Sequence, residues 1–164
     1  MDPIFTRTSV RNYEAKAVES DKVEKLLRAA MAAPSAKNQQ PWEFYVVREP
    51  KALRQLSVAS PYAGPAAKAP LVIVICSDTR RVTMPECVEL DLSAACENIL
   101  LEAEVLGLGA VWLGIAPLED RMAKVTAALE LPDHLQPFAI VPVGYPVGKK
   151  EQRDRYDASR VHER

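Results

Sequence analysis

The spacing of hydrophobic residues predicts three amphipathic helices along the chain. Residues 21–32 repeat apolar side chains at i, i+3, i+4 and i+7, and Asp21 with Glu24 gives a capping-box spacing at the start. Residues 50–59 and 117–129 show the same periodicity. Each of these two segments begins with a proline, which is well tolerated at the first helical position. We therefore expect the second and third helices to begin at their prolines.

Alternating or continuous apolar residues predict four short strands. Residues 42–48 alternate, whereas residues 71–76 form a continuous apolar run, which is typical of a strand covered on both faces. Residues 110–115 and 138–144 are the other two. Pro142 cannot donate to a sheet ladder, so we expect an edge position or a bulge there. The length of 164 residues, without an internal repeat or a low-complexity linker, indicates one domain over residues 1–164.

Residues 85–106 form the most informative predicted helix because they carry two apolar stripes. The broad stripe contains Val88, Leu92, Ala95, Cys96, Ile99, Ala103 and Leu106, and the second contains Leu90, Ala94, Leu101 and Val105. A helix on the surface of a monomer needs only one apolar stripe. We expect this helix to lie either at the centre of the fold or between the core and a second subunit.

Composition and charge describe an ordinary globular chain. The sequence is 48% hydrophobic and 26% charged with a net charge of −1, which does not support binding to nucleic acid or to a membrane surface. Its apolar runs are too short to span a bilayer. Three cysteines without C-x-x-C spacing and a start without a secretory signal favour a cytoplasmic protein with reduced thiols. The two histidines form no cluster with other metal ligands, so we expect no metal site.

Residues 33–44 join the first predicted helix to the first strand and carry hydroxyl and carboxamide side chains. Pro34 and Pro41 fix their own φ angles and restrict the residues before them. The result is a stiff loop suited to binding the polar edge of a planar ligand. The alternative is a plain connection that is polar because loops are polar. Composition alone leaves both interpretations open.

Familiar catalytic motifs do not occur in this sequence. Gly107 and Gly109 lie after a helix and before a strand, the reverse of a dinucleotide fingerprint, and the third glycine is replaced by Trp112. No phosphate-binding P-loop, nucleophile elbow or histidine-based triad is present. Arg7 and Arg11, with hydroxyls between them, would suit a phosphate, because guanidinium binds phosphate in a bidentate manner. These features favour an enzyme whose cofactor carries the chemistry.

Four segments match the motifs of a known family. Residues 7–11 (R-T-S-V-R) match an R-x-S-[VI]-R phosphate motif, and residues 33–42 match A-P-S-x-x-N-x-Q-P-W at every fixed position. Residues 107–114 resemble G-L-G-[AS]-x-W-x-G, and the segment from 144 to 162 resembles a carboxy-terminal arm. The chain thus resembles the short members of the nitroreductase family, the flavin-dependent NAD(P)H oxidoreductases that bind FMN.

The resemblance implies a role for thirteen residues around FMN, with no catalytic side chain and no metal. Arg7, Ser9 and Arg11 would hold the phosphate, with Thr8 beside them through its backbone, and Arg155, with Arg153, would reach the same phosphate from the tail. Asn38 would bond the polar edge of the flavin ring, with Gln40 supporting the loop or the ribityl chain. Pro34, Ser35 and Ala36 would pack on the flavin of the partner subunit. Leu113 and Gly114 would offer a backbone amide beside the reactive flavin nitrogen.

The resemblance also implies an architecture. It is an α+β fold of three layers, in which a mixed, mainly antiparallel sheet is flanked by helices. Two chains would form an intertwined homodimer with FMN at the interface, and residues from about 146 to 164 would form an arm that packs on the partner.

The implied activity is reduction of nitroaromatics, quinones or similar small acceptors with NADH or NADPH, by a ping-pong hydride transfer. One alternative is another flavin reaction, such as reductive dehalogenation, dehydrogenation or flavin breakdown. Others are a non-catalytic flavin-binding or sensing module and an interaction domain without a cofactor. Longer members carry extra helical structure where this chain has only the short segment 77–87. The sequence therefore leaves the acceptor and the cover of the flavin open.

Overall fold

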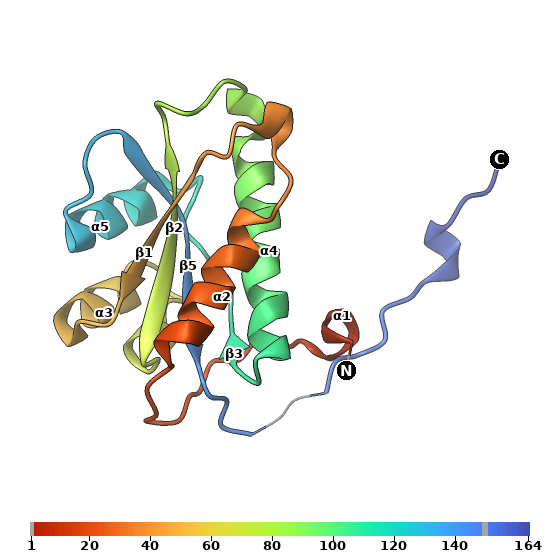
Figure 1. The fold of residues 1–164 in the computed structure, drawn as a ribbon, viewed down its shortest axis with the longest axis horizontal. Helices are drawn as coiled ribbons and strands as arrows, with labels where there is room; N and C mark the ends of the chain where they lie inside the picture. Colours follow the sequence, from red (N-terminus) through yellow and green to blue (C-terminus); the bar gives the residue numbers. More distant parts are fainter. Residues whose placement is uncertain (1, 149–150) are drawn as a thin grey trace.

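The computed structural model describes residues 2–148 and 151–164, and its centre is a five-stranded sheet (Figure 1). The strands are β1 (Trp42–Val47), β2 (Leu71–Asp78), β3 (Gly109–Ala110), β4 (Leu113–Gly114) and β5 (Leu135–Gly144). Their order is β1-β2-β5-β3, with β4 also paired to β5, and every pair is antiparallel. A parallel bridge joins Ser9 to Ala110. The predicted α+β fold with a mixed, mainly antiparallel sheet is confirmed.

Helices cover both faces of the sheet and give the fold three layers (Figure 1). One face carries α2 (Ser20–Met31) and α4 (Val88–Val105), and the other carries α3 (Pro50–Ser57) and α5 (Glu119–Leu129). The shorter helical segments are α1 (Pro3–Thr6) and 3₁₀ turns at Ala36–Asn38, Gly64–Ala67, Pro85–Cys87 and Ala158–Arg160. Figure 1 also shows the last residues of the chain running away from the sheet and its helices.

Strand β2 divides its side chains between the two hydrophobic clusters. The residues facing α2 and α4 are Leu71, Ile73 and Ile75, and those facing α3 and α5 are Val72, Val74 and Cys76. All six are fully buried. Burial of each aliphatic side chain among them stabilises the fold by about 1.5–3 kcal/mol. The continuous apolar run therefore predicted this strand correctly, including its cover on both faces.

The predicted capping box at the start of α2 is wrong. The helix begins at Ser20, and its N-cap residue, Glu19, makes no side-chain bond to the first turn. Asp21 lies inside that turn, where a carboxylate still interacts favourably with the helix dipole. Glu24 accepts from the side chain of Arg28, one turn later, with an Nη2–Oε1 distance of 2.7 Å.

The two predicted helix starts at prolines have different outcomes. α3 begins at Pro50 as predicted, and Glu49 caps it by accepting from the backbone N–H groups of its first turn. α5 begins at Glu119 rather than at Pro117, because Leu118 between them has an extended, non-helical backbone with φ −84° and ψ 105°. The proline therefore belongs to the turn that leads into α5.

Pro142 lies in the interior of the sheet, so the predicted edge position is wrong. β5 pairs with β2 on one side and with β3 and β4 on the other. The irregularity in the β2–β5 ladder lies between Ile75 and Cys76 of β2, far from the proline. The Pro142 carbonyl accepts from the backbone N–H of Val111 at 3.4 Å and from the hydroxyl of Tyr13 at 3.2 Å. The side of Pro142 on which other residues carry an N–H thus faces β3 and β4.

The same proline explains why the predicted strand 110–115 appears as two short strands. β3 and β4 keep one continuous register against β5, since Ala110 lies opposite Val143 and Leu113 lies opposite Ile140. Val111 donates to Pro142 but receives no bond in return, because proline has no N–H. The ladder is interrupted there while the path of the chain continues.

Only one of the two stripes of α4 is buried within this chain. The broad stripe packs on the sheet, where Leu92, Cys96 and Ile99 are at most 1% exposed. On the second stripe, Leu90 is 68% exposed and Val105 is 61% exposed. A position at the centre of one chain therefore does not explain this second stripe.

Candidate functional site

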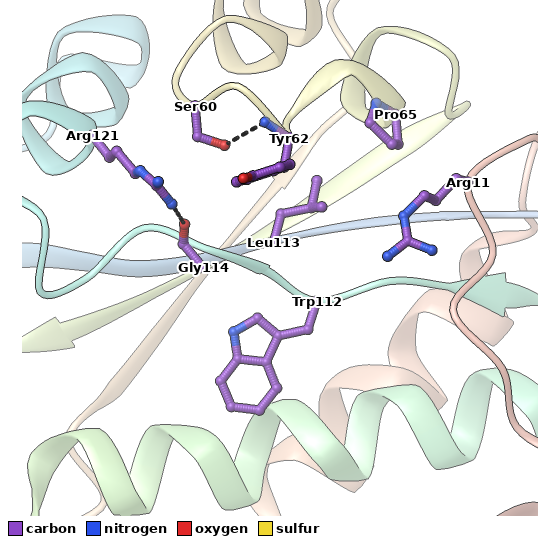
Figure 2. A pocket seen from close by; sticks show the side chains of 8 residues that line it. All are labelled: Arg11, Ser60, Tyr62, Pro65, Trp112, Leu113, Gly114 and Arg121. Atoms are coloured by element: carbon purple, nitrogen blue, oxygen red, sulfur yellow. Dashed lines mark hydrogen bonds between the residues drawn. The ribbon is translucent and has the colours of Figure 1, made fainter.

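A pocket of about 380 Å³ opens beside the β3–β4 edge of the sheet (Figure 2). Its lining residues come from the amino-terminal segment, the 3₁₀ segment Gly64–Ala67 and the turn before it, the edge strands with Trp112 between them, and α5. They are Arg11, Ser60, Tyr62, Pro65, Trp112, Leu113, Gly114 and Arg121. The structure thus brings together three of the predicted site residues, Arg11, Leu113 and Gly114. The other five were missed by sequence reasoning.

The floor of this pocket is an open strand edge. The backbone N–H of Ile115 donates to the Phe138 carbonyl at 3.1 Å. In an antiparallel ladder, hydrogen-bonded pairs alternate with pairs that share no hydrogen bond, so the neighbouring pair, Gly114 with Ala139, shares none. The N–H and C=O of Gly114 therefore point away from β5, and by the same alternation so do those of Trp112. The Gly114 carbonyl accepts from Arg121, and the Gly114 N–H and the backbone groups of Trp112 are available to the polar edge of a planar ligand.

The amino-terminal segment covers the adjacent part of the edge. Val10 donates to the Ala110 carbonyl at 3.0 Å, which continues the parallel bridge at Ser9. Gly109 allows this contact, because a Cβ there would lie 2.6 Å from a methyl carbon of Val10. Gly114, in contrast, has no heavy atom within 4 Å of its ideal Cβ position and leaves the floor open.

Two arginines lie at opposite ends of the pocket (Figure 2). Arg121 donates from Nη1 to the Gly114 carbonyl at 3.1 Å, and Arg11 donates from Nη1 to the Ser9 carbonyl at 3.4 Å. In the part of the chain that the structure describes, neither guanidinium has a carboxylate within ion-pair distance. The pocket is therefore electropositive and suited to an anionic ligand.

A second, smaller cavity of about 50 Å³ adjoins Arg11 and gathers the predicted phosphate residues. It is lined by Thr8, Ser9, Val10, Arg11, Asn12, Val147 and Gly148. Arg7 lines neither cavity, because its Nε lies 3.5 Å from the Oε1 of Glu97 on α4. The phosphate role of Arg7 stays a prediction.

The predicted loop 33–42 lies at the other edge of the sheet, next to β1. Two strands, β2 and β5, separate β1 from the edge that forms the pocket. Gln40 lines a different groove of about 390 Å³, together with Trp42, Phe44 and Arg81. Within one chain, the structure does not bring Pro34, Ser35, Ala36, Asn38 or Gln40 to the pocket beside Gly114.

This loop holds an unusual backbone conformation. Lys37, Asn38 and Gln40 have φ angles of 50°, 54° and 46°, in the left-handed region that costs non-glycine residues about 1–3 kcal/mol each. Contacts from outside the loop offset this strain, since the backbone N–H of Ala36 donates to the buried carboxylate of Asp91 at 2.9 Å. Strain of this kind is concentrated at functional sites.

The tail arginines lie in a third place. Arg153 and Arg155 line a cavity of about 500 Å³ with Ile4, Phe5 and Tyr156, beside α1. The structure does not bring them to Arg11. Their predicted contact with a phosphate therefore stays a prediction.

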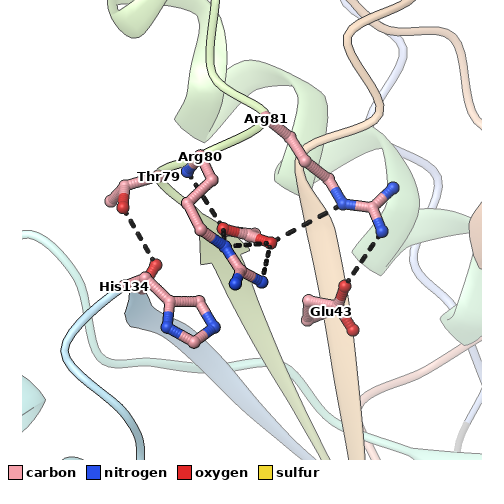
Figure 3. A network of polar contacts seen from close by, with 6 residues as sticks. Glu43, Thr79, Arg80, Arg81 and His134 are labelled. Carbon is pink, nitrogen blue, oxygen red and sulfur yellow. Dashed lines mark hydrogen bonds and ion pairs between the residues drawn. The ribbon is translucent and has the colours of Figure 1, made fainter.

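A polar network fixes the end of β2 next to the strained loop (Figure 3). Asp78 is 1% exposed and accepts from the Nε of Arg80 at 2.9 Å and from its Nη2 at 2.8 Å. These hydrogen bonds hold the pKa of the Asp78 carboxyl well below its usual range. Arg81 lies 3.5 Å from Glu43 of β1, and Thr79 donates to the His134 carbonyl at 2.9 Å. The network ties β1, β2 and the start of β5 together.

The described residues include neither a reactive buried thiol nor a cluster suited to a metal ion. Burial raises the pKa of the Cys76 thiol to about 12 and that of Cys96 well above its usual value, so neither is a nucleophile at neutral pH. Over residues 2–148 and 151–164, no cluster of three or more acidic, cysteine or histidine side chains could hold a metal ion. Within the same ranges, no helix combines the length and apolarity that crossing a bilayer requires.

Comparison with known proteins places this site in a family. The sequence model of the nitroreductase family matches residues 4–63 and 57–145. A protein of Methanothermobacter thermautotrophicus, provisionally named NADH dehydrogenase/NAD(P)H nitroreductase, is 40% identical over 162 residues, covering 99% of this chain and 85% of that protein. The chain therefore belongs to the nitroreductase family.

Solved structures agree with this assignment. A crystal structure from Clostridium acetobutylicum, provisionally named an NADH oxidase, matches with a TM-score of 0.95 at 48% identity and covers 98% of both chains. A provisionally named nitroreductase from Desulfovibrio desulfuricans, solved in complex with FMN, matches with a TM-score of 0.88 at 30% identity. The match covers 99% of this chain and 94% of that one.

Proposed function

We propose that this protein is an FMN-dependent oxidoreductase that takes electrons from NADH or NADPH and reduces small acceptors such as nitroaromatics or quinones. The observation that carries the proposal is the open strand edge at Trp112 and Gly114. It lies between Arg11 and Arg121, neither of which has a carboxylate partner among the described residues. Membership of the nitroreductase family and the FMN complex of the Desulfovibrio desulfuricans relative support it.

The residues of the pocket fit the two chemically different ends of FMN. Thr8, Ser9 and Arg11 supply hydroxyls, backbone N–H groups and a positive charge for a phosphate. At the other end, the N–H of Gly114 faces an open space that a planar ring can enter, because glycine has no Cβ to fill it. Tyr62 and Trp112 add aromatic walls to the same pocket.

When bound, FMN would supply the hydride chemistry, and the side chains of this protein would position and shield it. Gly114 would donate its amide proton to the ring edge, while Trp112 would keep water from one face. Trp112 is itself held by Phe138, with ring centroids 5.6 Å apart. Reductant and acceptor would use the same open side in turn, which is a ping-pong scheme. No side chain need act as a nucleophile.

We also propose that a second copy of the chain completes the site. Loop 33–42 is built as one unit, since Ser35 accepts from the N–H of Asn38 at its carbonyl and from the N–H of Gln40 at its hydroxyl. This unit lies at the sheet edge away from Gly114 in its own chain. In a homodimer it would reach the partner's FMN as a whole, so Asn38 and Gln40 would serve the same flavin as Pro34, Ser35 and Ala36.

The exposed apolar surface supports such a dimer. Leu90 and Val105 on α4 and Phe5 on α1, which is 71% exposed, are large hydrophobic residues open to solvent in the single chain. The arm from residue 151 onward leaves the body of the same chain and would pack on the partner (Figure 1). An interface of this kind would bury the second stripe of α4.

The visible spectrum of the purified protein during titration with FMN tests the proposed function. We expect a yellow protein, or saturable uptake of added FMN, followed by anaerobic bleaching with NADH or NADPH and recovery of colour with a quinone or nitroaromatic. A colourless protein that fails to take up FMN would refute the proposal. Bleaching without acceptor-dependent recovery would instead favour a sensing module, and product analysis would separate reduction from dehalogenation or dehydrogenation.

A further inference from the structure

Arg121 is bonded to the strand edge that forms the floor of the pocket. It lies in the first turn of α5, and its Nη1 donates to the Gly114 carbonyl at 3.1 Å (Figure 2). The other end of the same peptide unit, the N–H of Ile115, donates to the Phe138 carbonyl at 3.1 Å. The peptide after Gly114 is therefore held from both sides, which restricts rotation of a residue that has no side chain of its own.

The charge of Arg121 is not neutralised by a neighbouring carboxylate. Among the described residues, Arg7 is paired with Glu97 and Arg80 with Asp78, whereas no carboxylate lies within 4.0 Å of the Arg121 guanidinium. Lys124, one turn further along α5, lies 3.8 Å from Asp120. Arg121 thus places an uncompensated positive charge beside Gly114 at the end of the pocket away from Arg11.

We propose that Arg121 is a positioning residue that also sets the electron affinity of the bound flavin, an inference that rests on the FMN site proposed above. By holding Gly114, the Arg121 guanidinium keeps the Gly114 N–H directed at the ring edge. Its charge lies next to that edge and favours the reduced, more negative form of FMN over the oxidised form. A bound flavin ring would exclude water from this end of the pocket, and the attraction would then be weakly screened.

The charge and the hydrogen bond can be separated by substitution. Arg121→Gln retains an N–H donor and removes the charge, whereas Arg121→Lys retains the charge. Lys124→Gln is the matched control, because it removes one positive charge from the same helix without touching Gly114. Arg121→Met keeps the aliphatic stem and serves as the neutral variant if the glutamine variant does not fold.

The test is the reduction potential of bound FMN, measured by anaerobic equilibration against a reference dye, together with the affinity for oxidised FMN. For Arg121→Gln we expect about a tenfold shift toward oxidised flavin, which is about 30 mV for a two-electron couple. Affinity for oxidised FMN should change by less than about threefold. Arg121→Lys should restore most of the potential, and Lys124→Gln should leave it unchanged.

Three results would overturn the inference. The first is an unchanged potential in Arg121→Gln or Arg121→Met, and the second is an equal shift in Lys124→Gln. The third is equal weakening of oxidised and reduced FMN, which would indicate a merely structural role. The titration of the wild type tests the proposed function separately. If the wild type takes up FMN and reduces it with NADH or NADPH, but the variants show no shift in reduction potential, only the role of Arg121 is rejected. No uptake by the wild type would reject both.

Discussion

The side chain of Gln39 donates from Nε2 to the Oδ2 of Asp91 at 2.7 Å and so joins the loop before β1 to the first turn of α4. The other oxygen of this carboxylate accepts from the backbone N–H of Ala36 at 2.9 Å. Gln39 in turn accepts at Oε1 from the N–H groups of Thr83 and Met84, both at 2.9 Å. One glutamine therefore joins three segments and holds the strained loop in place.

Replacing Gln39 by alanine should destabilise the protein by about 1–3 kcal/mol, because it leaves the Oδ2 of the buried Asp91 carboxylate and two backbone donors without the partner that Gln39 supplies. The change is measured as a fall in the urea midpoint of the protein without FMN at neutral pH. Gln55→Ala on the exposed side of α3 is the control and should stay within about 0.5 kcal/mol of the wild type. Equal midpoints for Gln39→Ala and the wild type would show that the loop keeps its conformation without the hydrogen bonds of Gln39.

The two glycines of the edge strands should respond differently to alanine. A Cβ at Gly109 would lie within 2.7 Å of three side-chain carbons of Val10, so Gly109→Ala should lower the melting temperature by several degrees. Gly114→Ala meets no atom within 4 Å and should leave the melting temperature of the protein without FMN unchanged. Because its methyl group enters the space proposed for the ring, Gly114→Ala should instead weaken FMN binding. Similar behaviour of the two variants in both assays would contradict this assignment.

Removing the guanidinium of Arg11 should weaken FMN binding by about ten- to a hundredfold, since a charge-assisted hydrogen bond contributes about 1.5–3 kcal/mol. Arg7→Ala should have a smaller effect, because Arg7 is already engaged with Glu97. Fluorescence titration with FMN measures both, and Arg54→Ala on α3 controls for the loss of one surface charge. A larger loss for Arg7→Ala than for Arg11→Ala would reverse the proposed order.

The network around Asp78 should make stability depend on pH in the acidic range. The Asp78 carboxyl has a lowered pKa in the folded state, whereas an unfolded aspartate has a pKa near 3.9. Its contribution is therefore fully present above about pH 5 and is lost as the pH falls toward the folded pKa. Between pH 5 and pH 2.5, the urea midpoint of the wild type should fall more steeply than that of Asp78→Asn. Asp120 is an exposed carboxylate on α5, and Asp120→Asn should follow the wild type. Parallel curves of urea midpoint against pH for all three proteins would exclude the Asp78 network as the cause.

Local pattern was enough to predict the core of this fold. The continuous apolar run at 71–76 indicated a strand covered on both faces, and the broad apolar stripe of the helix after it packs on the sheet. Predictions based on single local rules were less reliable. Pro142 lies in an interior strand, where the lack of its N–H removes only one hydrogen bond of the ladder, opposite Val111. Asp21 does not cap α2 because that helix already begins at Ser20.

The missed part of the site depends on contacts between distant segments. Arg11, Tyr62 and Arg121 lie far apart in the sequence, and only the folding of α3 and α5 onto one face of the sheet brings Tyr62 and Arg121 to the edge strand. Gln39 stands at a variable position of its motif, and nothing in the sequence links it to Asp91. The motifs did indicate Arg11 and Gly114, which line the pocket, because a charge and a missing side chain are visible in the sequence itself.

The central claim is that each FMN site combines the Arg11 pocket of one chain with loop 33–42 of another. Co-expression of two differently tagged chains tests it, one carrying Arg11→Ala and the other Asn38→Gly with Gln40→Gly. Glycine suits these loop positions because both have positive φ angles. Each parental homodimer should bind FMN weakly, because both of its sites carry one defect.

The decisive measurement is the FMN stoichiometry of the doubly tagged heterodimer. If sites are shared between chains, one of its two sites is intact, and the heterodimer should bind one FMN per dimer with nearly wild-type affinity. If each chain builds its own site, every site in the heterodimer keeps a defect. Binding as weak as that of the two parental homodimers would therefore contradict the account.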